Sequence, residues 1–292
     1  MTTPGQRLRD AWMSPPLMIP GAFNALTARL AERLGYRAVY LSGGALAAGW
    51  AGVPDVGLVT QAEFAAQAAI LAASTTLPLL VDADTGFGGP VHVERTVQLY
   101  ERAGAAGLHI EDQTWPKRCG HLTGKSLVSA AEMAAKIRAA AASRREPSFV
   151  VVARTDARSV EGFDAAVARA RLYVEAGADM IFPEAMESAE EFARFAAAVP
   201  GPLVANMTEF GRGPLIPAED LAAMGYVAVL YPLTAFRAAM RAAEETLVAL
   251  RDHGTQAGVV DRMQTRARLY DLLGYDGLEA RDRAYFGDEP PA

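Results

Sequence analysis

The feature that most constrains how this chain folds is an alternation of short apolar runs with longer Ala-rich segments of helical periodicity. The apolar runs end in polar residues or glycine, and several helical segments end in the glycine that favours a helix C-terminus. This pattern is typical of repeated βα units. The predicted strands are Leu17 to Pro20, Ala38 to Leu41, Leu79 to Asp82, Gly107 to Glu111, Phe149 to Thr155, Met180 to Phe182, Leu203 to Asn206 and Val227 to Tyr231. The predicted helices include 24–35, 62–74, 91–104, 130–144, 163–177 and 188–199.

Eight such units predict a closed TIM-type (β/α)8 barrel, because they occupy about 230 residues and such barrels are typically about 250 residues long. Residues 1–254 are expected to form this barrel. After residue 254 the rhythm stops, and residues 255–292 are expected to add helices and a polar, Pro-ended tail to the same domain. We expect these helices to pack on a neighbouring subunit.

Composition restricts the function classes. The chain has 28 Lys and Arg against 34 Asp and Glu, a formal charge of -6, whereas nucleic-acid binding needs a clustered positive field. The single cysteine cannot form an internal disulfide, which fits a reducing compartment. The first residues have no apolar signal core, and no apolar run approaches the roughly 18 residues of a membrane span. We therefore expect a cytoplasmic protein that binds neither nucleic acid nor membrane.

Polar residues and a pair of glycines gather where the apolar runs end, which in a TIM-type barrel is the mouth that carries the active site. They are Ser42, Gly43, Gly44, Asp82, Asp84, Glu111, Asp112, Arg154, Asp156, Glu184, Asn206 and Thr208. Crowded carboxylates repel one another, so a hard cation is expected among them. Asp82 and Asp84 precede a glycine-rich turn and are the predicted ligands of Mg²⁺, with Mn²⁺ as the alternative ion. The four histidines are scattered, which disfavours zinc.

Several of these residues also have a purely structural interpretation. Asp84 would hydrogen-bond its own turn, and Arg154 would pair with Glu184 or Asp156. His109 lies within a predicted strand, where a core histidine is the simpler interpretation. The functional interpretation is favoured because polar residues recur at successive strand ends.

The only cysteine, Cys119, lies in the segment "KRCGHLTGK" at 117–125. An inert buried cysteine usually lies in an apolar run, whereas this thiol follows two cations and precedes a glycine and a histidine. We therefore interpret it as reactive. No serine-elbow motif accompanies it, and a proton donor beside a metal-bound anion favours carbon–carbon cleavage over hydrolysis.

The motifs taken together resemble those of a known family. The segments "YLSGG", "LLVDADTGFG", "GLHIEDQ", "KRCGH", "VVARTDA", "FPEA" and "NMTEFG" resemble the isocitrate lyase and phosphoenolpyruvate mutase superfamily, in order, from about Leu17 to about Arg268. The similarity is greatest to its short branch, which cleaves 2-methylisocitrate. Isocitrate lyase itself carries a large insertion that this chain lacks, and the mutases lack a cysteine in this loop.

The resemblance implies a role for each matching residue. The implied metal ligands are Asp82 and Asp84, and the supporting carboxylates are Asp55, Glu111 and Asp112. The implied catalytic residues are Cys119, on a loop that closes over the substrate, His121, Glu111 and Arg154. The residues implied to bind the substrate are Ser42, Gly43, Gly44, Cys119, Gly120, Arg154, Glu184, Asn206, Thr208, Arg237 and Arg266.

The implied activity is Mg²⁺-dependent cleavage of 2-methylisocitrate to pyruvate and succinate in propionate catabolism, by a homotetramer that exchanges its final helices. Sister activities share these motifs: a 2,3-dimethylmalate lyase, an oxaloacetate hydrolase, an isocitrate lyase or a phosphonopyruvate-processing enzyme. One methyl group contributes only about 1–3 kcal/mol of discrimination. Leu122 and Thr123 replace an Arg-Pro pair common in the methylisocitrate branch, whereas Phe182-Pro183 and 231–233 fit its methyl-accommodating pattern. The non-enzymatic alternative is a carboxylate-sensing barrel.

Overall fold

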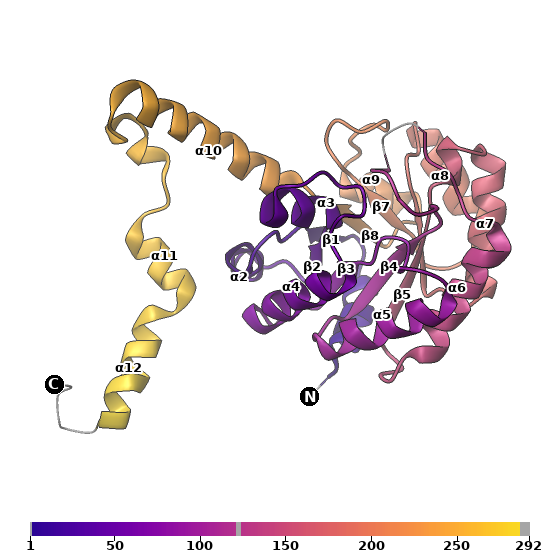
Figure 1. Ribbon diagram of the computed structural model, residues 1–292, viewed down its shortest axis with the longest axis horizontal. Helices are drawn as coiled ribbons and strands as arrows, with labels where there is room; N and C mark the ends of the chain where they lie inside the picture. The colour runs from indigo at the N-terminus through magenta and orange to yellow at the C-terminus, as the bar shows by residue number, and fades with distance from the viewer. Residues whose placement is uncertain (1, 121–123, 287–292) are drawn as a thin grey trace. The chain divides into compact units, whose positions relative to one another are not determined.

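The computed structural model describes residues 2–120 and 124–286, and its centre is a ring of parallel strands surrounded by helices (Figure 1). The strands in these residues are β1 (Leu17–Pro20), β2 (Val39–Leu41), β3 (Leu79–Asp82), β4 (Gly107–Glu111), β5 (Val150–Thr155), β6 (Met180–Pro183), β7 (Val204–Asn206) and β8 (Ala228–Tyr231). Every predicted strand is present, and each boundary lies within one residue of the predicted one.

Backbone hydrogen bonds close the ring. Strands β2 to β6 pair in chain order, and β8 pairs with both β1 and β7. A parallel bridge between Gly21 and Tyr40 joins β1 to β2, and another between Ile181 and Leu203 joins β6 to β7. This order is that of a (β/α)8 barrel, so the predicted fold class is confirmed.

The helices on the outside of the ring agree with the predicted ranges, except for the last, Ala218–Ala223, which was not predicted. They are α2 (Ala25–Arg33), α4 (Gln61–Ser74), α5 (Pro90–Arg102), α6 (Ala130–Ser143), α7 (Phe163–Glu175), α8 (Ala189–Ala198) and α9 (Ala218–Ala223). Short turns complete the loops, namely α3 (Gly43–Leu46), η1 (Ala47–Ala51) and η2 (Ala157–Ser159). Buried alanines such as Ala68, Ala134 and Ala166 let these helices approach the strands closely.

Side chains of the strands alternate between two apolar clusters. In β5, Val150 and Val152 belong to the cluster inside the ring, whereas Val151 and Ala153 belong to the cluster between strands and helices. This is the two-residue period of a strand that is buried on both faces. It also fixes which residues of each strand can face the interior at the mouth of the barrel.

The N-terminal mouth of the barrel is closed by α1 (Pro4–Trp12), a helix that the sequence analysis did not predict. Leu8 and Trp12 are buried in the inner cluster, and Arg9 Nε donates to the Ser148 carbonyl at 2.8 Å. The available signal was a Thr3 N-cap followed by proline at the first helical position. Closing this mouth leaves the opposite one for function.

Contacts divide the chain into two units, Met1–Phe236 and Arg237–Ala292. The elements after the barrel are α10 (Thr234–His253), η3 (Ala257–Arg262), α11 (Arg266–Leu273) and α12 (Tyr275–Phe286). The sequence pattern predicts that the barrel ends near residue 254. The first unit ends at Phe236 instead, so α10 belongs mostly to the second unit. Within 237–286 the only buried residue is Val259, so the described part of this unit has no core of its own.

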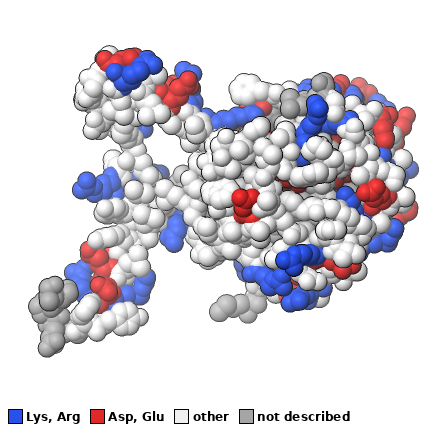
Figure 2. Space-filling view, viewed as in Figure 1, with Lys and Arg blue, Asp and Glu red and all other residues white. Residues whose placement is uncertain are grey.

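None of the helices in the described ranges has the length and apolar character that a membrane crossing requires. On the face shown in Figure 2, basic and acidic groups are interspersed over the barrel with uncharged surface between them.

The packing of α1 predicts that Leu8→Ala lowers the free energy of unfolding of the barrel by about 2–5 kcal/mol, because it leaves a cavity in the inner cluster. Leu8 is 2% exposed. Urea unfolding followed by circular dichroism measures the effect. Met13→Ala is the control, because Met13 is 75% exposed and its truncation is expected to change stability by only about 0.5 kcal/mol. Equal effects of the two changes would contradict the assigned role of α1.

Candidate active site

Polar side chains at the C-terminal mouth of the barrel follow the two-residue period of the strands. Residues i and i+2 of a strand share one face, and the inner face of most strands ends in polar or charged groups. The inner positions are Tyr40 and Ser42, Asp82 and Asp84, His109 and Glu111, Arg154 and Asp156, Phe182 and Glu184, and Asn206 and Thr208. The barrel therefore brings together most of the residues predicted for the site.

A cavity of about 60 Å³ lies among these side chains. The predicted site residues that line it are Ser42, Gly44, Asp55, Asp82, Cys119, Gly120, Arg154, Glu184, Asn206 and Thr208. The sole thiol and the predicted metal ligand Asp82 thus face one cavity from different segments of the chain.

Asp82, the last residue of β3, is held through both carboxylate oxygens. Its Oδ2 accepts a hydrogen bond from the Gly43 N–H at 3.0 Å and another from the Tyr40 hydroxyl at 3.3 Å. Its Oδ1 accepts from the Asp84 N–H at 2.9 Å and lies 3.5 Å from His109 Nε2. The Gly43 N–H therefore orients this carboxylate, and its predicted role in binding the substrate stays a prediction.

Asp84 lies in a turn with a positive φ of 45° and faces a buried lysine. Lys117 Nζ is 2.8 Å from Asp84 Oδ1 and also contacts Asp55, and the Lys117 side chain is only 3% exposed. Burial alone would lower the pKa of Lys117, but Asp84 and the neighbouring carboxylates outweigh it and raise the pKa well above its ordinary value. Lys117 is therefore a permanent positive charge beside the predicted metal ligands.

Arg154, on β5, is surrounded by carboxylates. Its Nε and Nη2 donate to Asp156 at 2.9 and 3.2 Å. Its Nη1 lies 3.3 Å from Glu111 Oε2, and its Nη2 lies 3.3 Å from Glu184 Oε2. Burial alone would lower the pKa of Arg154, but these carboxylates raise it well above its ordinary value. Arg154 thus pairs with both partners of its structural interpretation and still lines the cavity.

Asp84 and Glu111 are buried carboxylates whose negative charge is only partly compensated by the nearby cations. Burial raises the pKa of Asp84 to about 7, although Lys117 opposes the shift. Burial also raises the pKa of Glu111 well above its usual range, although Arg154 and Lys117 oppose it. At neutral pH both groups therefore resist ionisation in the absence of a further cation.

Asp82 behaves differently from its neighbours. Burial alone would raise the pKa of Asp82, but His109, which is charged in the acid range where Asp82 titrates, outweighs it together with Lys117 and Arg154, and the pKa falls to about 2. Burial lowers the pKa of His109, so that ring is uncharged near neutral pH. Lys117 and Arg154 are then the charges that keep Asp82 ionised.

These residues fit a hard divalent cation. Glu111 Oε1 is buried and accepts no hydrogen bond within the described ranges, and Asp84 Oδ1 meets only the Lys117 ammonium at 2.8 Å. A cation would satisfy such oxygens. The same ranges contain no group of three or more His, Cys, Asp or Glu side chains in a metal-binding arrangement. A cation at Asp82 and Asp84 would therefore complete its shell with water and substrate oxygens, as Mg²⁺ does and structural zinc does not.

Gly120, the residue after Cys119, lies directly against Arg154 and Glu184. A Cβ on Gly120 would stand 2.4 Å from Arg154 Nη2 and 2.7 Å from Glu184 Cγ, so this close approach requires glycine. Cys119 is a free, half-buried thiol that lines the cavity. His121, also predicted to be catalytic, lies outside the described residues.

Asp112 occupies a different environment from the one expected of a carboxylate that supports the metal. It accepts hydrogen bonds from the Thr155 hydroxyl at 2.8 Å, the Tyr173 hydroxyl at 2.8 Å and the Asp156 N–H at 2.9 Å. Arg169 Nη1 lies 3.5 Å from it. Asp112 therefore anchors the end of β5 to α7, because it follows the inward Glu111 by one residue and faces outward.

Arg237 and Arg266 belong to the second unit, at the start of α10 and of α11. Their predicted role in binding the substrate stays a prediction. Ser42, also predicted to bind the substrate, accepts a hydrogen bond from the Ala45 N–H at 3.4 Å and begins α3.

Sequence reasoning assigned no site role to Tyr40, Lys117 or Lys125, whereas its interpretation of His109 as a core histidine agrees with the structure. Tyr40 precedes Ser42 by two positions and contacts Asp82, and its hydroxyl lies 2.7 Å from His109 Nε2. His109 is fully buried and belongs to this polar network. Lys125 pairs with Asp156 at 2.6 Å. The two-residue period would have found Tyr40 and His109, whereas the pairing of Lys125 depends on the loop conformation.

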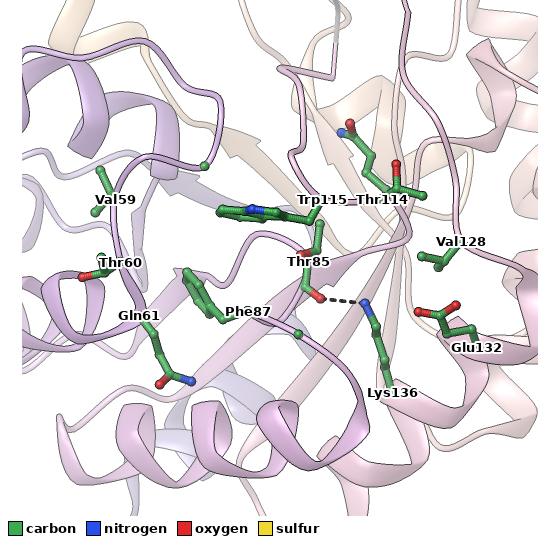
Figure 3. A pocket seen from close by; sticks show the side chains of 13 residues that line it. Val59, Thr60, Gln61, Thr85, Phe87, Thr114, Trp115, Val128, Glu132 and Lys136 are labelled. Carbon is green, nitrogen blue, oxygen red and sulfur yellow. Dashed lines mark hydrogen bonds between the residues drawn. The ribbon is translucent and has the colours of Figure 1, made fainter.

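A larger cavity of about 740 Å³ lies elsewhere on the barrel (Figure 3). Trp115 and Phe87 contribute aromatic rings to it, and Lys136 Nζ donates to the Thr85 carbonyl at 3.1 Å. None of the predicted site residues lines it. Its size alone does not make it the centre of the chemistry, because the paired carboxylates, the arginine and the thiol all face the smaller cavity.

The fold and this mouth define a TIM-barrel enzyme of the phosphoenolpyruvate phosphomutase family, whose model matches residues 9–251. The 2-methylisocitrate lyase of Aeropyrum pernix is 50% identical over 280 residues, which cover 96% of this chain and 90% of that protein. A structure of oxaloacetate acetylhydrolase with 3,3-difluorooxalacetate has a TM-score of 0.92 at 36% identity and covers 99% of both chains.

A second similar structure contains Mg²⁺. Phosphonopyruvate hydrolase in complex with oxalate and Mg²⁺ has a TM-score of 0.88 at 34% identity and covers 98% of this chain and 100% of that one. The chain therefore belongs to this family, and the resemblance found in the sequence is confirmed.

Gly43→Ala is expected to weaken divalent-cation binding by about tenfold or more, because outer contacts of a ligating carboxylate set its geometry. A Cβ at this position would stand 2.7 Å from Asp82 Oδ2 and displace it. Calorimetric titration with Mn²⁺ measures the affinity. Gly258→Ala is the matched control, because a Cβ there meets nothing within 4 Å. Unchanged affinity in Gly43→Ala would contradict the assignment of Asp82 as a ligand.

Proposed function

We propose that this protein is a Mg²⁺-dependent carbon–carbon lyase that cleaves 2-methylisocitrate to pyruvate and succinate. The observation that carries the proposal is that Cys119 lines the same small cavity as Asp82 and Arg154. A proton donor, a cation site and a guanidinium are what cleavage of a hydroxy tricarboxylate requires. The identity of about one half to a 2-methylisocitrate lyase over nearly the whole chain supports this substrate.

The residues of the cavity suit binding of a polyanionic substrate. Asp82 and Asp84 would hold Mg²⁺, which when bound polarises the oxygen of the carbonyl that forms. Arg154 offers a charge-assisted donor for a carboxylate at the succinate end. Asn206 Nδ2 lies 3.2 Å from Glu184 Oε2, which fixes the amide beside that end of the cavity.

The bond changes balance without an oxidant or a further reactant. The substrate hydroxyl loses its proton, its oxygen forms the C=O bond of pyruvate, and the adjacent C–C bond breaks. The electron pair of that bond passes to the departing carbon, which takes a proton from Cys119 and leaves as succinate. Glu111 would accept the hydroxyl proton once a cation bound nearby has ionised it, and the pKa that burial raises then makes this carboxylate a stronger base.

One wall of the cavity is apolar. Phe182, Leu230, Pro232 and Leu233 contribute to this wall. An apolar wall offers contact for the methyl group that distinguishes 2-methylisocitrate from isocitrate, although such a contact is worth only about 1–3 kcal/mol. It supports the methylated substrate over its unmethylated counterpart.

We also propose that the enzyme acts in propionate catabolism in the cytoplasm, as a homotetramer that exchanges its final helices. The nearly coreless second unit supports assembly, because exposed apolar side chains such as Leu247 and Tyr270 would be covered by another subunit. The single cysteine supports a reducing compartment.

A panel of 2-hydroxy acids and 2-oxo acids tests the substrate. The purified protein is expected to release pyruvate and succinate from 2-methylisocitrate faster than it cleaves isocitrate, 2,3-dimethylmalate, oxaloacetate or phosphonopyruvate. EDTA should abolish turnover and excess Mg²⁺ should restore it. Faster turnover of another member of the panel would identify that compound as the substrate instead. Turnover in the presence of EDTA would contradict the metal assignment, and ligand binding without any product would favour the carboxylate-sensing barrel.

Cys119→Ser tests the proton donor. Because the hydroxyl is a much weaker acid than the thiol, kcat is expected to fall by about 10²–10⁴-fold. Circular dichroism and the affinity for Mn²⁺ should remain those of the wild type, since Cys119 lies on neither a strand nor a metal-binding turn. Wild-type turnover in this variant would eliminate the role of the thiol.

A further inference from the structure

We propose that Lys125 is a positioning residue that holds the Cys119–Gly120 segment over Arg154. Lys125 lies outside every set of residues assigned above to the metal, the substrate or the proton transfer. The inference rests on the proposed lyase function for its effect on turnover. The geometry itself can be tested on the free protein.

The Lys125 ammonium links two parts of the site. Its Nζ donates to the Gly120 carbonyl and, at 2.6 Å, to Asp156 Oδ1. The Lys125 side chain is 1% exposed and that of Asp156 is fully buried. A lysine is almost never buried this completely unless it is paired, so the ion pair and the carbonyl contact together hold its position.

Asp156 transmits this contact to the substrate-binding arginine. Its two oxygens accept from Arg154 Nη2 at 3.2 Å and from Arg154 Nε at 2.9 Å, while Lys125 occupies Oδ1 as well. The Asp156 backbone is fixed in turn, because its N–H donates to Asp112. Lys125 and Arg154 therefore share one rigid carboxylate, and moving either cation changes the support of the other.

The position of the reactive segment follows from these contacts. Gly120 leaves no room for a Cβ above Arg154, so its backbone already lies at closest approach. The carbonyl that Lys125 binds belongs to the residue immediately after Cys119. Without the ammonium, the Gly120 carbonyl loses its hydrogen-bond donor, and the Cys119 thiol can move away from the cavity. A misplacement of about 1 Å can cost about 100-fold in rate.

The test uses Lys125→Met, which keeps the aliphatic length and removes the charge. We expect kcat to fall about 100-fold with little change in KM. As a readout independent of turnover, Cys119 is alkylated with iodoacetamide in the absence of substrate. Because Cys119 is the only thiol, one rate is observed, and we expect it to rise by about threefold or more as the segment becomes more accessible.

Lys136→Met is the matched control. Lys136 is also buried and also donates to a backbone carbonyl, but it contacts neither Gly120 nor Asp156 in the described ranges. Its removal should leave the alkylation rate unchanged. Lys125→Gln, which keeps a donor but no charge, replaces Lys125→Met if that variant does not fold, and is expected to give a smaller rise in the same direction.

A double-mutant cycle that combines Lys125→Met with Asp156→Asn is the second test. If Lys125 acts through Asp156, the loss of kcat caused by Lys125→Met should be much smaller in the Asp156→Asn background than in the wild type. A wild-type alkylation rate in folded Lys125→Met, or strictly additive effects in this cycle, would overturn the inference. A wild-type protein that lacks lyase activity would instead overturn the proposed function and leave the alkylation result to decide the positioning role.

Discussion

The structure of the site depends on keeping several carboxylates buried at one mouth of the barrel. Each would lose its hydration there, so each must meet a cation, a donor or a proton. The buried carboxylates that face the interior are Asp82, Asp84, Glu111, Asp156 and Glu184, and the lysines and arginine that contact them within the described ranges are Lys117, Lys125 and Arg154. These cations anchor the loop and the strand ends to one another, and the shortage at Asp84 and Glu111 leaves a place for a divalent ion.

The two-residue period of the strands brings these groups together at one mouth of the barrel. Most strands have an apolar inner face in the first half and a polar one at the end, so the N-terminal half of the interior is packed and the C-terminal half carries the reactive groups. Helix α1 fills the opposite mouth with Leu8 and Trp12. The free energy gained from apolar burial in the packed half offsets the cost of burying charge in the other half.

Local sequence patterns were sufficient for the strands, the outer helices and the position of Asp82, Asp84 and Arg154, because each depends on periodicity within one βα unit. They were insufficient where a residue is defined by a partner far along the chain. Asp112 follows Glu111 directly and looks equivalent in sequence, yet the strand period turns it outward to Tyr173. The pairing of Lys125 with Asp156 spans 31 residues and depends on a loop that no periodicity predicts.

The most direct test of the account is electron paramagnetic resonance of Mn²⁺ titrated into the wild-type protein and into Asp84→Asn. The account predicts one saturable site in the wild type whose affinity falls by an order of magnitude or more when Asp84 loses its charge. Equal binding in the two proteins, or no saturable binding in the wild type, would contradict the claim that these buried carboxylates are arranged to hold a divalent ion.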